Sequence, residues 1–138
     1  MRLVADTNTI ISGLLWQGAP RQVLDLAFSG QLELFTSATI LTEFEDVFHR
    51  EKFLQRLQLV GADPHELILE YAALATIVRP VKLSTIIQDD PDDDAVLSCA
   101  VAANAEAIIS GDSHLLKLKV YQTIPILTAG ELIKRFRE

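Results

Sequence analysis

The segment DDPDDDAVLSCAVAA, residues 89–103, is the part of the sequence from which the fold and the site are inferred. Five carboxylates fall within six residues, and an apolar helix is expected to begin among them. Asp90 is the expected N-cap, and Pro91 suits the first helical position. A cap and the helix dipole use one or two of these charges. Packing five together is unfavourable unless a cation lies among them, so the segment indicates a cation site that other acids of the chain complete.

Composition limits the classes of protein to consider. The chain has 138 residues, 49% of them hydrophobic, which predicts a single domain over residues 1–138 with a buried core. The net charge of −7 argues against nonspecific nucleic-acid binding by overall charge, although it is compatible with a local basic patch or a metal-loaded site. Cys99 is the only cysteine, which fits a reducing cytoplasm and a small buried side chain. We recognise no signal peptide or membrane-spanning segment.

Short apolar segments alternate with helical ones along the whole sequence. The expected strands are residues 3–5, 32–36, 77–78, 107–109 and 124–127. The expected helices lie around residues 10–15, 21–28, 37–48, 53–60, 63–75, 91–103, 115–118 and 129–136. Strands that are short and apolar throughout are typical of a parallel sheet covered on both faces. We therefore expect an α/β fold with three layers (α/β/α), a central, mainly parallel sheet of about five strands, and a helical arm from the helix-rich residues 42–74.

Acidic residues follow two of the expected strands. Asp6 comes directly after the first strand and Asp112 after the fourth, while Asp94 opens the helix before the fourth strand. Ligands of open parallel sheets bind at the carboxyl ends of the strands, near the point where the strand order reverses. The three acids are therefore expected at one edge of the sheet. Taken singly, Asp6 and Asp112 would each serve equally well as a helix N-cap.

A fourth acid is expected from the helix that Ser37 caps. Glu43 and Glu45 fall on opposite margins of its apolar face, and periodicity does not choose between them. Carboxylate oxygens select hard cations such as Mg²⁺ or Mn²⁺. The chain's histidines are scattered without zinc-ligand spacing and are expected at the surface: His49, His65 and His114.

Together these residues resemble PIN-domain nucleases, in particular the VapC-like branch of bacterial and archaeal toxins from type II toxin–antitoxin pairs. The resemblance is carried by VADTN (4–8), Glu43, DDD (92–94) before LSCA (97–100), ISGD (109–112) and IPILT (124–128). It covers essentially the full chain. Its specific part is the order and spacing of the four acids rather than any one motif.

The resemblance implies a PIN-like fold and a Mg²⁺- or Mn²⁺-dependent endoribonuclease that cleaves RNA with a metal-activated water. The residues that match the family's catalytic acids are Asp6, Glu43, Asp94 and Asp112. Of these, Asp6, Asp94 and Asp112 are the implied metal ligands, with Asp93 as an alternative to Asp94. Asn8 and Ser110 match polar positions that support the acids or contact substrate. The resemblance also implies a cytoplasmic homodimer, inhibited by an antitoxin whose segment occupies the acidic groove.

Three clusters of basic residues are candidates for steering the RNA backbone, and each is also explained as a solvated helix surface. They are Arg50 with Lys52 and Arg56, Lys117 with Lys119, and Lys134 with Arg135 and Arg137. Trp16 is open to three interpretations: a base-stacking platform, a dimer contact, or a core side chain.

Other classes of protein fit the sequence less well. A haloacid dehalogenase-type phosphatase requires a second Asp two residues after the first, and this chain has Asn8 there. A response-regulator domain requires a Lys after a late strand, whereas Lys117 falls inside an expected helix. A catalytically silent PIN-like scaffold that binds RNA or protein stays open on sequence alone.

Overall fold

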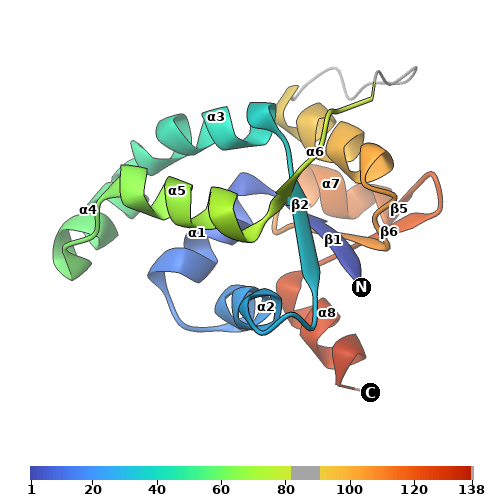
Figure 1. Ribbon diagram of the computed structural model, residues 1–138, viewed down its shortest axis with the longest axis horizontal. Helices are drawn as coiled ribbons and strands as arrows, with labels where there is room; N and C mark the ends of the chain where they lie inside the picture. The colour runs from blue at the N-terminus through green and yellow to red at the C-terminus, as the bar shows by residue number, and fades with distance from the viewer. Residues whose placement is uncertain (82–90, 138) are drawn as a thin grey trace.

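The computed structural model describes residues 1–81 and 91–137, with the backbone alone at 91–93. In this part of the chain the strands are β1 (Arg2–Ala5), β2 (Glu33–Thr36), β3 (Thr76–Ile77), β4 (Ala107–Ile109), β5 (Val120–Tyr121) and β6 (Ile124–Leu127). They form one sheet in the order β3-β2-β1-β4-β6-β5, in which every pairing is parallel except that of β5 with β6 (Figure 1). The expected α/β class with a mainly parallel sheet is confirmed.

Strand β1 lies at the centre of the sheet. Leu3 is in register with Leu34 of β2 on one side and with Ala107 of β4 on the other. Leu3 and Val4 are fully buried, because both faces of this strand are covered. Burial on both faces is the physical reason that these strands read as unbroken apolar runs in the sequence.

The helices cover both sides of the sheet. They are α1 (Thr7–Leu15), α2 (Ala19–Phe28), α3 (Ala38–Phe48), α4 (Glu51–Val60), α5 (Pro64–Leu74), α6 (Pro91–Ala102), α7 (Ser113–Leu118) and α8 (Ala129–Phe136). Figure 1 shows α3 and α6 on one side of the sheet and α2 and α8 on the other, with α4 at the end of the molecule away from the strands. The helical arm expected from residues 42–74 is thus the end of α3 with α4 and α5. In the described part of the chain, no helix is both long and apolar enough to cross a membrane.

The helix boundaries follow from local capping chemistry. The Ser37 side chain accepts from the Ile40 amide at the start of α3, and Asp63 accepts from the His65 amide at the start of α5. Helix α8 begins with a capping box in which Thr128 and Glu131 each accept from the other's amide. Each of these helix starts is where the sequence predicts it.

Helices α1 and α2 approach each other closely at Gly13. A Cβ atom at this position would lie 2.8 Å from both the Pro20 carbonyl oxygen and the Leu24 Cδ1 atom. Only glycine fits here without moving backbone. The contact places the first turn of α2 beside α1, where both helices line the site described below.

The structure differs from the expectations at one strand and at several helix starts, among them α1, which begins at residue 7 rather than 10, and α7, which begins at residue 113 rather than 115. The edge strand β5 was missed, because it has two residues and its turn uses Gln122 and Thr123 at positive φ (46° and 70°) rather than glycine or asparagine. Helix α2 begins at residue 19 rather than 21, since Pro20 is accommodated in its first turn, and α4 begins at residue 51 rather than 53. Helix α6 begins at Pro91 as predicted, whereas Asp90 as its N-cap lies outside the described residues.

Candidate active site

The site lies at the carboxyl ends of β1 and β4, where the strand order reverses. Strands β1 and β4 are adjacent and parallel, although more than 100 residues separate them in the sequence. Asp6 follows β1, and its amide donates to the Ile109 carbonyl at 3.0 Å. The Ser110-Gly111-Asp112 segment follows β4. The two acid-bearing strand ends are therefore neighbours, as ligand sites of open parallel sheets require.

Asp6 is buried and held by hydrogen bonds on both carboxylate oxygens. Its side chain is 7% exposed. Its Oδ1 accepts from the Thr9 amide at 2.8 Å, which makes Asp6 the N-cap of α1. Its Oδ2 accepts from the Ser110 hydroxyl at 2.5 Å. A carboxylate has about four acceptor positions, so Asp6 has a fixed orientation and still has lone pairs for a cation.

Ser110 connects the two acid-bearing loops. Its buried hydroxyl donates to Asp6 and accepts from the Asp112 amide at 2.9 Å. Asp112, half-buried, in turn caps the short helix α7 by accepting from the His114 amide. Capping explains part of the role of both aspartates, and the serine link places their two loops beside each other.

Replacing Ser110 with alanine is expected to destabilise the protein by about 1–3 kcal/mol, because the buried Asp6 Oδ2 and the Asp112 amide each lose their partner. The matched control is Ser29→Ala, since the Ser29 hydroxyl makes an exposed bond to the Leu26 carbonyl. The control is expected to change stability by about 0.5 kcal/mol or less. Urea denaturation of both variants measures the difference. Equal midpoints for the two variants would show that the serine link carries no stability.

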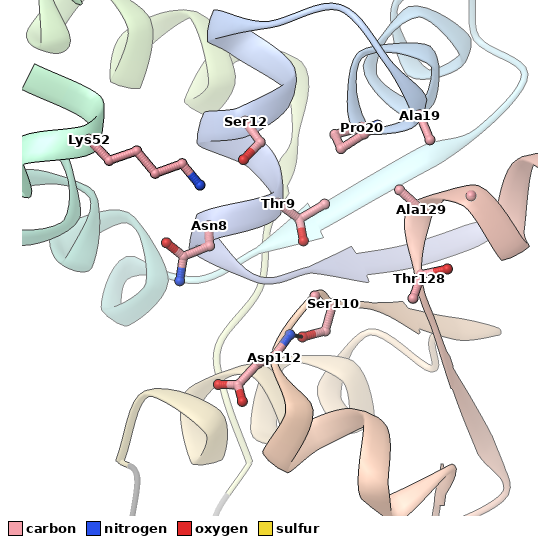
Figure 2. Close-up of a pocket in the computed structure, with 12 residues that line it drawn as sticks. Asn8, Thr9, Ser12, Ala19, Pro20, Lys52, Ser110, Asp112, Thr128 and Ala129 are labelled. Atoms are coloured by element: carbon pink, nitrogen blue, oxygen red, sulfur yellow. Dashed lines mark hydrogen bonds between the residues drawn. The ribbon is translucent and has the colours of Figure 1, made fainter. Parts of the chain in front are cut away.

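A cavity of about 480 Å³ opens beside this link. Asn8 and Ser12 of α1, Lys52 of α4, and the Ser110–Asp112 segment line it, together with the first turns of α2 and α8. Figure 2 shows the Lys52 side chain and Asp112 on different sides, with Asn8 between them. Three of the predicted site residues, Asn8, Ser110 and Asp112, thus share one cavity, and Asp6 joins them through its bond to Ser110.

Glu43 and Asp94 lie outside the cavity wall. The Glu43 carboxylate accepts from the Thr7 hydroxyl at 3.3 Å, so it faces the start of α1 directly after Asp6. Glu45 turns instead toward His65 on α5, where the two exposed side chains lie 3.8 Å apart. The geometry therefore distinguishes the two glutamates that periodicity left open. Asp94 is half-buried in the first turn of α6.

The donor atoms at this edge are suited to a hard cation. They are carboxylate, hydroxyl and amide oxygens, which are the ligands that Mg²⁺ and Mn²⁺ prefer. Within the side chains that the structure describes, no three acids, histidines or cysteines are close enough together to hold one ion. The Asp93 side chain, the alternative ligand, lies outside the described residues. The donor type fits a hard cation, and among the described side chains the acids do not form one closed cluster.

Other titratable groups have structural roles. Burial raises the pKa of the Cys99 thiol to about 12, so Cys99 packs as a small apolar side chain, as predicted. The hydrogen bonds from the Thr128 amide and hydroxyl lower the pKa of Glu131, with a further contribution from Arg135, which keeps the α8 cap charged. The three histidines are exposed, as expected, and none lines the cavity.

The structure also identifies which basic cluster reaches the site. The Arg50 guanidinium donates to the Asn8 side chain at 3.3 Å, and Lys52 lines the cavity. Trp16, half-buried, packs against Phe53 with ring centroids 5.8 Å apart, so it belongs partly to the core. Sequence spacing gave no reason to prefer this cluster, because its placement depends on how α4 packs against α1.

A comparison with family models decides the classification. The model described as "PIN domain" matches residues 2–114 and so includes Asp6, Glu43, Asp94 and Asp112. This chain belongs to the PIN domain family. PIN domains are generally nucleases, so membership indicates nuclease activity for this chain.

Two similar proteins place this PIN domain among known sequences and structures. It is 28% identical over 122 residues to "Uncharacterized protein MJ1680" of Methanocaldococcus jannaschii. The matched region covers 86% of this chain and 76% of the relative. It also resembles a chain of the crystal structure of VapBC2 from Rickettsia felis bound to a DNA fragment from their promoter. The TM-score is 0.59 with 15% identity, over 91% of this chain and 97% of that chain. At 15% identity, the likeness to the VapBC2 chain shows a shared fold alone.

Proposed function

We propose that this PIN domain is a Mg²⁺- or Mn²⁺-dependent endoribonuclease and the toxin of a type II toxin–antitoxin pair. The observation that carries the proposal is the link from Asp6 through Ser110 to Asp112 beside the cavity. It joins two acids at the reversal point of a parallel sheet, where ligands of such sheets bind. The family match over all four acids supports the same site.

In this proposal, Asp6, Asp94 and Asp112 would hold the cation, with Asp93 as an alternative to Asp94, and Glu43 is the fourth catalytic acid. A divalent cation, when bound, supplies Lewis acidity and charge neutralisation for phosphodiester hydrolysis. The chain's own groups fix the geometry. The Thr9 amide and the Ser110 hydroxyl orient Asp6, and the Thr7 hydroxyl orients Glu43.

Water attack in line with the leaving 3′ oxygen yields a 5′-phosphate and a 3′-hydroxyl. This route needs no histidine as acid or base, which agrees with the absence of histidines among the cavity-lining residues that the structure describes. Asn8 lies at the cavity wall beside Arg50, where it can contact the substrate. Asn8 and Ser110 are the proposed substrate-contacting and supporting residues.

The toxin role is supported by the structural likeness to a VapBC2 chain. We propose an antitoxin partner whose segment occupies the acidic edge and blocks RNA entry. The proposed assembly is a cytoplasmic homodimer. A neighbouring small reading frame that encodes a protein which binds this chain and suppresses its activity would support the toxin role.

Cleavage of single-stranded RNA in the presence of Mn²⁺ tests the proposal. We expect products with 5′-phosphate ends that appear with Mn²⁺ and disappear when EDTA removes it, because the acidic site repels phosphate without a cation. Gel separation of end-labelled RNA measures both results. RNA binding without cleavage under any metal would contradict the proposal and favour a silent scaffold. Cleavage that persists in EDTA would contradict the metal mechanism.

A further inference from the structure

Lys52 carries the one positive charge among the described residues that line the cavity. It lies in the first turn of α4, and Figure 2 shows its ammonium directed toward Asn8 and Ser12 of α1. None of the ion pairs formed by the described residues includes Lys52. In a chain of net charge −7, this ammonium faces the cavity, and no carboxylate of the described residues forms an ion pair with it.

Two aromatic rings lie beside the Lys52 side chain. Its Nζ atom lies 5.8 Å from the centroid of the Trp16 ring and 5.2 Å from that of Phe53. Phe53 is buried, and Arg56 also contacts the Trp16 ring while donating from Nε to the Leu15 carbonyl at 2.9 Å. Lys52 is exposed, so these rings favour the observed direction of its charge without fixing it.

The Ser12 hydroxyl is a further hydrogen-bond donor near Lys52, and Figure 2 shows it pointing into the cavity. Ala19 and Pro20, at the start of α2, also line the cavity, but Pro20 has no amide hydrogen and adds no donor. The Lys52 ammonium and the Ser12 hydroxyl thus lie near each other, whereas Figure 2 shows Asp112 on a different side of the cavity.

This arrangement fits an anion at one end of the cavity and a cation at the other. A single-stranded nucleic acid has a phosphate at every nucleotide, so a strand cut beside Asp112 carries neighbouring phosphates along the cavity. We propose that Lys52 binds the backbone phosphate next to the scissile one and so positions the RNA strand for cleavage. This subsite rests on the proposed ribonuclease function, and it assigns Lys52 a substrate-positioning role rather than a part in the chemistry.

Steady-state cleavage of a short single-stranded RNA tests the role of Lys52. For Lys52→Gln we expect KM to rise about tenfold with kcat within about twofold, since a phosphate contact that is remote from the reacting atoms contributes mainly to binding. Lys52→Arg is expected to restore most of the loss. The matched control is Arg2→Gln, which removes one positive charge at the start of β1, the end of that strand away from the site. This variant is expected to leave KM unchanged. The slope of log(kcat/KM) against log salt should fall by about 0.7 for Lys52→Gln alone.

Substrates with a single neutral methylphosphonate locate the contact. In the wild-type protein, one such position next to the cleaved bond should raise KM about tenfold, and in Lys52→Gln the same substitution should have no further effect. If the effects of Lys52→Gln and of the methylphosphonate on KM are additive, or if Lys52→Gln has the wild-type KM, the subsite is overturned. The proposed function still stands in that case, provided that the wild-type protein cleaves RNA. Failure of the wild-type protein to cleave any RNA would overturn both. Circular dichroism melting checks that each variant is folded.

Discussion

Replacing Asp6 with asparagine is expected to lower the rate of RNA cleavage by about 10³-fold or more without unfolding the protein. The substitution removes a charge that we assign to the cation, and metal-assisted charge stabilisation contributes several kcal/mol, at about tenfold in rate per 1.4 kcal/mol. The fold should survive, because asparagine is as good an N-cap as aspartate and its Oδ1 can still accept from the Thr9 amide. The measurement is the initial rate with Mn²⁺, together with a urea denaturation curve.

Asp63→Asn is the matched control for this experiment. Asp63 is likewise an aspartate at a helix N-cap, where it accepts from the His65 amide at 3.0 Å, but it does not line the cavity. The same chemical change there should leave the cleavage rate at the wild-type value. A folded Asp6→Asn protein that cleaves RNA as fast as Asp63→Asn would remove Asp6 from the proposed site.

The strand-end acids could be predicted from sequence because local rules fix their positions. Residues 3–5 and 107–109 are apolar throughout, which marks them as buried parallel strands, and an acid follows each. Parallel pairing then brings the two ends to one edge of the sheet. The sequence could not show that Ser110 bonds to Asp6, because a contact across more than 100 residues depends on which strands become neighbours.

Contacts made by helix packing were beyond sequence reasoning. Glu43 and Glu45 are equivalent by periodicity, and only the packing of α3 beside α1 brings Glu43 to Thr7. On sequence, Lys52 was one of several basic residues that could equally steer the RNA backbone. The structure shows it at the cavity, beside Trp16 and Phe53. These contacts are tertiary in origin, and no local propensity encodes them.

The capping and functional interpretations of Asp6 and Asp112 are compatible. Each carboxylate fixes the first turn of a helix through one oxygen, Oδ1 in both residues. Each also lies where a parallel sheet binds ligands. Capping holds these side chains in one orientation, which is what a cation site needs from its ligands before the cation binds. A structural role for an acid at a strand end is thus no argument against a catalytic one.

Replacing Phe44 with alanine is expected to destabilise the protein by about 3–5 kcal/mol. Phe44 is fully buried on α3, with its ring centroid 6.1 Å from that of Phe48 and 5.6 Å from that of Tyr71. Alanine leaves a cavity between α3 and α5 that the surrounding helices fill only in part. The control is Phe28→Ala, because Phe28 is 49% exposed and should cost much less. Urea denaturation measures both.

The Phe44 variant also tests how the candidate site is held. Glu43 precedes Phe44 on α3. If α3 shifts to fill the void that Phe44→Ala leaves, it would carry Glu43 away from Thr7. Domains of this size are stable by about 5–15 kcal/mol, so Phe44→Ala removes a large share. Phe44→Leu leaves a smaller cavity and should cost less, which keeps the protein folded for activity assays. If Phe44→Ala costs less than about 1 kcal/mol, α3 is not anchored by this aromatic cluster. The position of Glu43 would then depend on its own contacts at α1 rather than on the core beneath it.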